Sequence, residues 1–143
     1  YIISYDQYGK PSLNSEFNIS ISHSDQIVAL LLSKKKNIGI DVQQVKDKIY
    51  NVQKKFLNKK ELQNNDKIKD LDLLTKIWTS KEAIYKSINM KNVSFSKNLF
   101  IDTKNEKSNK CFGYFFKKNI KMKFRINYFN LENYILTYVY RIN

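Results

Sequence analysis

The hydrophobic pattern in the first third of the chain is typical of β-strands. In residues 17–22, isoleucines alternate with serines, which is the spacing expected of a strand. Residues 25–33 contain the apolar run IVALLL and predict a central strand that is buried on both of its faces. A polar, lysine-rich turn follows, and the alternation returns in residues 37–45. The pattern therefore predicts three strands in succession.

The middle of the chain follows a helical spacing instead. Residues 46–56 and 58–64 predict two short helices that are rich in lysine. A longer helix is expected from about Asp70 to Ile88, because apolar residues recur there every three or four positions and either Asp70 or Asp72 suits the positive N-terminal end. The pattern then predicts four further strands, at residues 98–103, 111–117, 121–130 and 133–142. We therefore expect an α+β fold in which a mostly antiparallel sheet carries one long packed helix.

The composition favours a single globular domain over residues 1–143. Hydrophobic residues make up 42% of the chain, and three glycines and one proline are too few for a loop-dominated scaffold. Cys111 is the only cysteine, so no internal disulfide can form and a reducing, cytoplasmic location is expected. The longest apolar run is far shorter than the ~20 residues of a membrane span, so no membrane-spanning segment is expected.

The chain is strongly basic, with a formal net charge of +13. A charge of this size favours an acidic partner, which can be nucleic acid, an anionic membrane or an acidic protein. The lysine excess can equally reflect a compositional bias that leaves lysines on solvated faces. The charge therefore indicates the sign of a partner rather than its class.

Three residues carry polar groups where the pattern predicts apolar or neutral ones. Glu82 projects between Trp78 and Tyr85, within the apolar stripe of the long helix. Asp41 lies in the middle of a predicted strand, where aspartate is depleted, and His23, the only histidine, lies where the first strand ends. An unpaired buried carboxylate is costly, so Asp41 and Glu82 require compensation.

One interpretation of the two carboxylates is a shared metal ion. If Asp41 and Glu82 both face inward, they repel each other unless a cation lies between them. Oxygen ligands without cysteine or histidine favour a hard cation, Mg²⁺ or Mn²⁺. Magnesium usually completes its coordination with water and phosphate oxygens, which predicts a phosphorylated substrate. Lys86, one turn after Glu82, is suited to neutralise phosphate charge on the same side.

Simpler interpretations are open for each residue. Glu82 can form an ordinary ion pair with Lys86 or Lys81 on the helix surface. His23 can be a structural or exposed residue at a strand end, and Asp41 can stabilise a turn. Taken singly, none of these signals is specific.

Four segments taken together resemble one family. In chain order they are YGKP at residues 8–11, FNISISHS at 17–24, GIDVQ at 39–43 and WTSKEAIYK at 78–86. They are similar to the successive motifs of 4′-phosphopantetheinyl transferases, in particular the surfactin-synthetase-activating type. The resemblance implies the fold of that family and Mg²⁺-dependent transfer of the 4′-phosphopantetheine arm of coenzyme A to a serine of an apo carrier protein. The second product would be 3′,5′-ADP.

The resemblance also implies a role for each matched residue. Asp41 and Glu82 correspond to metal ligands, and Glu82 also corresponds to the base for the incoming serine. Lys86 corresponds to the lysine that stabilises charge on the pyrophosphate. The residues implied to contact coenzyme A elsewhere are Lys10, at the nucleotide, and Ser22 and His23, at the 3′-phosphate.

Two features depart from the family pattern. Gln43 occupies a position where the family often has glutamate, so it is expected to be a weak metal ligand. The matched motifs correspond mainly to the second half of the surfactin-type enzymes, which bind coenzyme A between two similar halves. We therefore expect this domain either to be the C-terminal half of a longer enzyme or to self-associate.

Two other functions are compatible with parts of the sequence. With Gln43 and a single half, the chain can be a non-catalytic module that binds coenzyme A or carrier protein. A basic nucleic-acid-binding domain fits the net charge and the 14% of aromatic residues. It leaves Asp41 and Glu82 unexplained, however, and no RNA- or DNA-binding motif is recognisable. The transferase interpretation instead predicts an acidic acyl or peptidyl carrier protein and coenzyme A as partners, with no nucleic acid and no membrane.

Overall fold

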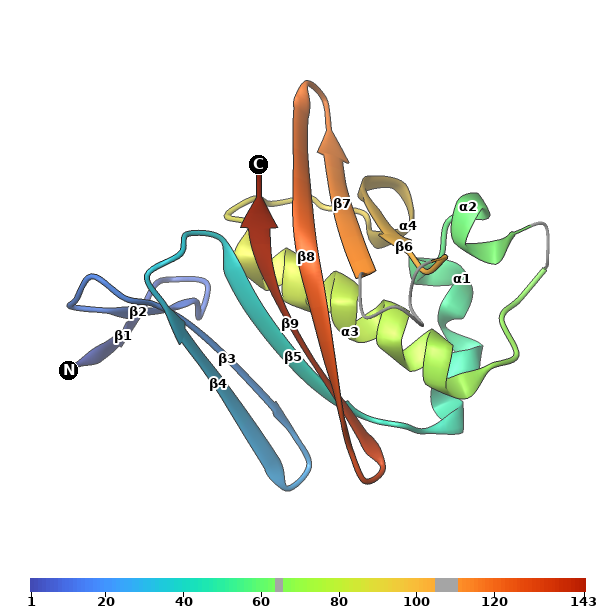
Figure 1. The fold of residues 1–143 in the computed structure, drawn as a ribbon, viewed down its shortest axis with the longest axis horizontal. Helices are drawn as coiled ribbons and strands as arrows, with labels where there is room; N and C mark the ends of the chain where they lie inside the picture. The colour runs from blue at the N-terminus through green and yellow to red at the C-terminus, as the bar shows by residue number, and fades with distance from the viewer. Residues whose placement is uncertain (64–65, 105–110) are drawn as a thin grey trace.

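A computed structural model describes residues 1–63, 66–104 and 111–143, and it confirms the α+β class (Figure 1). Every strand pairing within the described residues is antiparallel. The strands are β1 (Ile3–Tyr5), β2 (Pro11–Leu13), β3 (Asn18–Ser24), β4 (Ile27–Ser33), β5 (Ile38–Gln44), β6 (Leu99–Asp102), β7 (Cys111–Lys117), β8 (Ile120–Leu131) and β9 (Tyr134–Ile142). The helices are a 3₁₀ helix (Asp47–Asn51), α1 (Gln53–Phe56), α2 (Lys59–Leu62), α3 (Leu71–Ser87) and α4 (Phe95–Asn98).

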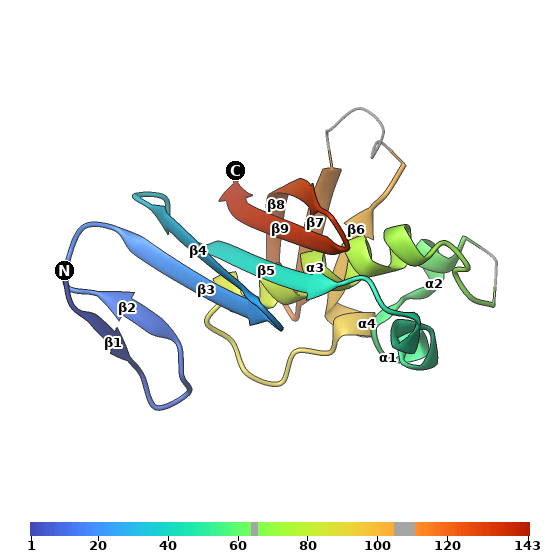
Figure 2. The ribbon, with the colours of Figure 1, turned by 90° about the horizontal axis from the view of Figure 1, so that it is seen from below.

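The core lies between α3 and a five-stranded sheet of order β5-β9-β8-β7-β6 (Figures 1 and 2). Leu74, Ile77 and Ile84 of α3 are fully buried in one cluster with alternate residues of the sheet, such as Phe124 and Val139. The predicted long helix and its packing are therefore confirmed. None of the helices in the described ranges is long and apolar enough to cross a membrane.

The short elements around this core differ in part from the prediction. The segment expected as a helix at 46–56 is a 3₁₀ helix followed by α1, and α2 is a single turn. Asn58 and Glu61 form a capping box that begins α2, while residue 64 of the predicted helix lies outside the described residues. The β1–β2 hairpin and α4 were not predicted, because neither has enough residues to show a period.

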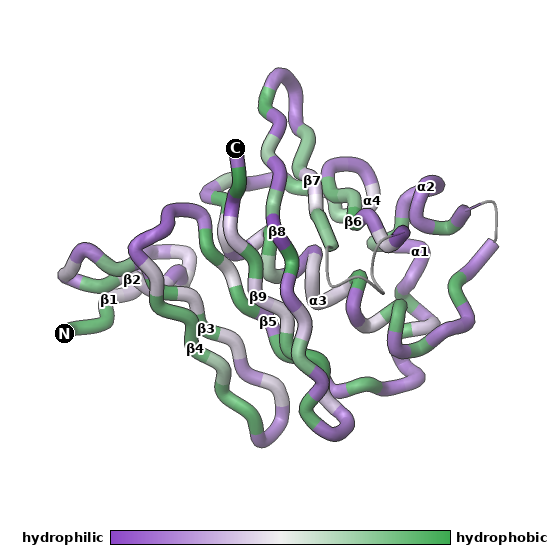
Figure 3. Tube along the Cα trace, viewed as in Figure 1, coloured by the Kyte–Doolittle hydropathy of each residue, from purple (hydrophilic) through white to green (hydrophobic). Residues whose placement is uncertain are grey.

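The prediction of a central, doubly buried strand at residues 25–33 is wrong. Strand β4 pairs with β3 in a separate two-stranded sheet and forms its outer strand (Figure 3). Val28, Leu30 and Leu32 are exposed by 74%, 50% and 51%, whereas Ala29 is buried against β5. Only one face of β4 has a neighbouring layer in the described residues, so an apolar sequence on both faces does not imply burial on both.

Strand β3 runs alongside β5 in the same direction, but its serine side chains make the contact. Each serine oxygen accepts a hydrogen bond from the backbone N–H of the residue 20 positions later. The outer edge of β5 therefore finds acceptors in hydroxyl groups rather than in a neighbouring backbone. The contacts are Ser20 Oγ with the Ile40 N–H (3.1 Å), Ser22 Oγ with the Val42 N–H (3.3 Å) and Ser24 Oγ with the Gln44 N–H (3.3 Å).

Lys81 anchors α3 to the small helices and to β6 from a fully buried position. Its ammonium group lies 2.7 Å from Glu61 Oε2, with both side chains at 0% exposure. It also donates to the carbonyl oxygens of Phe56, Phe95 and Leu99 at 2.6–3.0 Å. These four oxygen atoms compensate the positive charge of the buried lysine, so its role here is structural.

Gly39 sets the distance between β5 and α3. A Cβ atom at this position would lie 1.9 Å from the carbonyl oxygen of Ala83 and 2.9 Å from its carbonyl carbon. Both atoms belong to the backbone of α3 and cannot move away without moving the helix. Glycine is therefore required for α3 to lie directly on β5.

We expect Gly39→Ala to destabilise the domain by about 2–3 kcal/mol, because α3 must shift away from β5. Gly113→Ala is the matched control, since a Cβ there meets only the flexible ends of Ile84, Ile126 and Ile101. Its cost should be about 1 kcal/mol. Urea unfolding of the two variants measures both values, and an equal cost for the two would contradict the role given to Gly39.

Candidate active site

Asp41 is buried in the middle of β5 and is surrounded by hydrogen-bond donors. Its Oδ1 lies 2.9 Å from the Ser22 hydroxyl of β3 and 2.8 Å from the Lys86 ammonium of α3. Its Oδ2 accepts a hydrogen bond from the Gln43 side-chain amide at 3.0 Å. These three donors compensate a carboxylate that is only 2% exposed. Asp41 therefore belongs to a strand and does not stabilise a turn.

The two lysines that could have paired with Glu82 have other acidic partners. Lys86 binds Asp41 and also donates to the Ile40 carbonyl oxygen at 3.2 Å. Lys81 binds Glu61, as described above. The prediction of an ordinary pair between Glu82 and either lysine is therefore wrong for the contacts in the described residues.

Glu82 is half-buried, and its carboxyl group responds to this setting. Burial, the largest cause, and the nearby charge of Asp41 together raise the pKa of Glu82 to about 7, against the opposing effect of Lys86. The charges of Asp41, Glu82 and Lys86 therefore act on one another, and the structure brings these three predicted site residues together.

The flank of α3 that carries Glu82 is less buried than predicted. Tyr85 is 40% exposed, so it does not extend the core stripe. Its ring packs against Phe95 at 5.5 Å, and Phe95 also packs against Trp78 at 5.6 Å. Glu82 itself is only partly buried, so its carboxylate retains access to solvent at the margin of the core.

A cavity of about 670 Å³ lies beside this cluster, and we call it the Lys10 cavity. It is enclosed by the turn between β1 and β2, by β3 and by the end of α3. Asp6 holds the turn in shape, because its Oδ1 accepts hydrogen bonds from the backbone N–H groups of Tyr8 and Lys10, which lower the pKa of Asp6. The cationic residues among its lining are Lys10, Lys86 and Lys91.

The remaining predicted residues lie elsewhere. His23 is exposed on β3 and does not line the Lys10 cavity. Ser22 is buried beneath Asp41. The structure therefore brings Lys10 and Lys86 to one cavity, whose lining includes neither Ser22 nor His23. Ser22 nevertheless shares Asp41 Oδ1 with Lys86.

The donor chemistry at Asp41 and Glu82 fits a hard divalent cation. Two carboxylates and the Gln43 amide supply oxygen ligands, and the pKa of Glu82 is raised first by burial and second by the charge of Asp41, two effects that a cation would offset. Within the described ranges, no group of three or more histidine, cysteine, aspartate or glutamate side chains is arranged to hold a metal. A cation here would take few protein ligands and would leave room for water and phosphate oxygens, as Mg²⁺ prefers.

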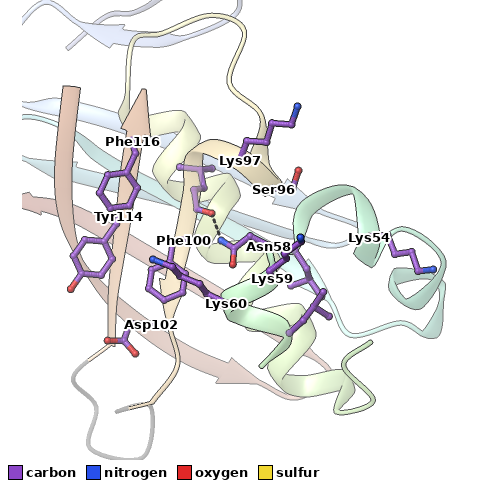
Figure 4. Close-up of a pocket in the computed structure, with 13 residues that line it drawn as sticks. Lys54, Asn58, Lys59, Lys60, Ser96, Lys97, Phe100, Asp102, Tyr114 and Phe116 are labelled. Atoms are coloured by element: carbon purple, nitrogen blue, oxygen red, sulfur yellow. Dashed lines mark hydrogen bonds between the residues drawn. The ribbon is translucent and has the colours of Figure 1, made fainter. Parts of the chain in front are cut away.

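A second cavity, of about 690 Å³, lies between the small helices and the edge strand β6 with its neighbour β7 (Figure 4). Its wall carries a row of stacked rings, with Phe100 and Tyr114 at 5.9 Å and Tyr114 and Phe116 at 6.1 Å. We call it the lysine groove, because four lysines and one acid, Asp102, line it. The lysines are Lys54, Lys59, Lys60 and Lys97.

Sequence comparison gives one family for the chain. The model of the 4′-phosphopantetheinyl transferase superfamily matches residues 37–139, which include Asp41, Glu82 and Lys86. Among curated proteins, the chain is similar to "4′-phosphopantetheinyl transferase gsp" of Aneurinibacillus migulanus. The two are 28% identical over 86 residues, which cover 58% of this chain and 36% of the relative, so the chain spans about a third of that protein's length. The family match covers most of the chain, and the chain belongs to the 4′-phosphopantetheinyl transferase superfamily.

Proposed function

We propose that this protein transfers the 4′-phosphopantetheine arm of coenzyme A to a serine of an apo carrier protein and releases 3′,5′-ADP. One observation carries the proposal: Asp41, Glu82 and Lys86 converge beside a cavity that contains further lysines. Acidic oxygens next to cationic side chains suit a substrate that carries a pyrophosphate. Membership in the superfamily supports the same reaction.

In this proposal, coenzyme A lies in the Lys10 cavity. Lys10 and Lys91 offer ammonium groups to its phosphates from the side of the β1–β2 turn, and Lys86 does so from α3. Lys86 also links the cavity to Asp41, so phosphate bound at Lys86 lies next to the two carboxylates. The nucleotide is then held on the side of Glu82 that faces Tyr85 and Lys86.

Glu82 acts as the general base. The serine oxygen attacks the phosphorus that bears the pantetheine arm, a new P–O bond forms, and the P–O bond to the ADP portion breaks. The hydroxyl proton passes to Glu82, and 3′,5′-ADP leaves with the bonding electron pair. A carboxyl group with a pKa of about 7 suits a base that works near neutral pH.

Asp41, Glu82 and, more weakly, Gln43 would hold Mg²⁺ or Mn²⁺. When bound, the cation supplies positive charge to the pyrophosphate oxygens. The alternative is a domain that binds coenzyme A or carrier protein without chemistry, and an assay of transfer distinguishes the two.

The decisive measurement is the mass of an apo carrier protein after incubation with coenzyme A, Mg²⁺ and this protein. We expect a gain of one phosphopantetheine arm with the unaltered protein and no gain with Asp41→Asn or Glu82→Gln. Asp72→Asn is the matched control, because Asp72 is an exposed acid of the same helix, and its ion pair in the described structure is with the partly buried Lys76. Transfer by either site variant at the control rate would remove these carboxylates from the reaction.

The raised pKa of Glu82 predicts a pH dependence of stability. The folded protein holds this proton up to about pH 7, whereas the unfolded chain loses it near the ordinary value of 4.5. Without divalent cations, the contribution of Glu82 is therefore present below pH 4.5 and is lost as the pH rises to about 7. Urea unfolding in EDTA should show Glu82→Gln gaining stability over the unaltered protein across this range. Parallel pH profiles of the two proteins would contradict the assigned pKa.

We also propose that the carrier protein is acidic and rests on the lysine groove. Because Tyr85 and Lys86 of α3 line the Lys10 cavity, we place coenzyme A on that side of Glu82 and the acceptor serine on another. Phe95 packs between Trp78 and Tyr85 on that flank, and the next two residues, Ser96 and Lys97, line the groove. Four lysines against one aspartate give this surface the charge that an acidic partner requires.

A triple variant, Lys59→Ala/Lys60→Ala/Lys97→Ala, tests the groove. Its KM for the carrier protein should rise roughly 10-fold, at about 0.5 kcal/mol for each exposed charge pair, with KM for coenzyme A unchanged. The control is Lys34→Ala/Lys36→Ala/Lys121→Ala, which removes the same charge from exposed lysines outside the groove. An equal increase in the KM for the carrier protein in both triple variants would mean that binding depends only on the net charge of the protein and not on the groove.

A further inference from the structure

Ser22 makes two hydrogen bonds that use its hydroxyl group in opposite senses. The oxygen accepts from the Val42 backbone N–H at 3.3 Å, and the hydroxyl proton is donated to Asp41 Oδ1 at 2.9 Å. The side chain lies between β3 and β5, and the residue is 5% exposed. A hydroxyl group has one proton to donate, and Asp41 takes it.

The neighbouring serines of β3 show that only Ser22 has this second role. Ser20 and Ser24 accept from the N–H groups of Ile40 and Gln44 in the same way. Their hydroxyl groups contact no carboxylate among the hydrogen bonds of the described residues. The amide contact is therefore the common structural function of the row, and the bond to Asp41 is specific to Ser22.

The bond fixes one oxygen of Asp41 from the side of β3. Lys86 reaches the same oxygen from α3, while Gln43 binds the other oxygen from within β5. The carboxylate is thus held by groups from three elements, and its orientation does not depend on a ligand. Groups that orient a metal-binding carboxylate in this way typically change metal affinity 10- to 100-fold when they are removed.

We infer that Ser22 is a positioning residue for Asp41 and does not contact the 3′-phosphate of coenzyme A. The inference rests on the proposed function, in which Asp41 binds a divalent cation. Both the burial of Ser22 and the commitment of its proton oppose a phosphate contact. The resemblance to other transferases implies the phosphate contact, so the two roles make opposite predictions.

The test compares Ser22→Ala with Ser20→Ala. Each variant loses one acceptor for a backbone amide of β5, and Ser22→Ala also loses the donor to Asp41, so its urea stability should fall more than that of Ser20→Ala. Binding of Mn²⁺, followed by electron paramagnetic resonance without any substrate, should weaken about 10-fold or more in Ser22→Ala and remain unchanged in Ser20→Ala. Ser22→Thr keeps the hydroxyl group and should restore Mn²⁺ binding. If Ser22→Ala does not fold, Ser22→Cys replaces it, because a thiol of similar size is a weak donor.

Transfer kinetics supply the second readout. Ser22→Ala should need more Mg²⁺ for half-maximal rate, with an unchanged KM for coenzyme A and the same loss with 3′-dephospho-coenzyme A. A raised KM that disappears with 3′-dephospho-coenzyme A would place Ser22 at the phosphate and overturn the inference. Mn²⁺ binding equal to that of the unaltered protein, or no Mn²⁺ binding by the unaltered protein, would also overturn it. Failure of transfer with normal Mn²⁺ binding would instead reject the proposed function alone.

Discussion

The direct contact between α3 and β5 is the constraint on which the rest of this structure depends. It exists because Gly39 places no side chain between the strand and the Ala83 carbonyl group. At this distance Lys86 reaches Asp41, and Glu82 comes close enough for the two carboxylates to affect each other. The remaining sides of β5 are also occupied, by β9 through backbone pairing and by β3 through serine hydroxyl groups. The strand that carries the candidate site is therefore held on every side.

The same helix shows two ways of placing a charge near a core. Lys81 is completely buried, and one carboxylate with three carbonyl oxygens compensates its charge. Glu82, the next residue, is half-buried, and the described residues give it no comparable set of donors. The first arrangement stabilises the native fold as it stands. The second leaves a carboxyl group whose charge responds to whatever binds beside it, which is the property that a catalytic residue requires.

Much of the fold could be predicted from the sequence, because long periodic segments such as α3 and the four C-terminal strands encode their own structure. The convergence of Asp41 and Glu82 was also indicated, because two out-of-pattern carboxylates needed a common explanation, and Lys86 lies one turn after Glu82. The third out-of-pattern residue, His23, is exposed and lies outside the Lys10 cavity. The strand β4 was predicted, but its exposure was not. The hydrophobic pattern shows which residues are apolar and does not show whether a second layer covers them. The pairing of Lys81 with Glu61 and the bond from Ser22 to Asp41 depend on contacts between distant segments, which no local pattern contains.

The serine row on β3 also governs where this chain tolerates changes of length. The contact with β5 recurs at every second residue of β3. The alignment of the two strands is therefore set by serine side chains rather than by backbone pairing. One residue inserted between Ser20 and Ser24 would turn the later serines to the opposite face and leave amide groups of β5 without acceptors. Extra residues in the lysine-rich turn after β4 would lengthen a loop and leave the alignment intact. Natural variation in this part of the chain is therefore expected in the turn, with strand β3 constant in length.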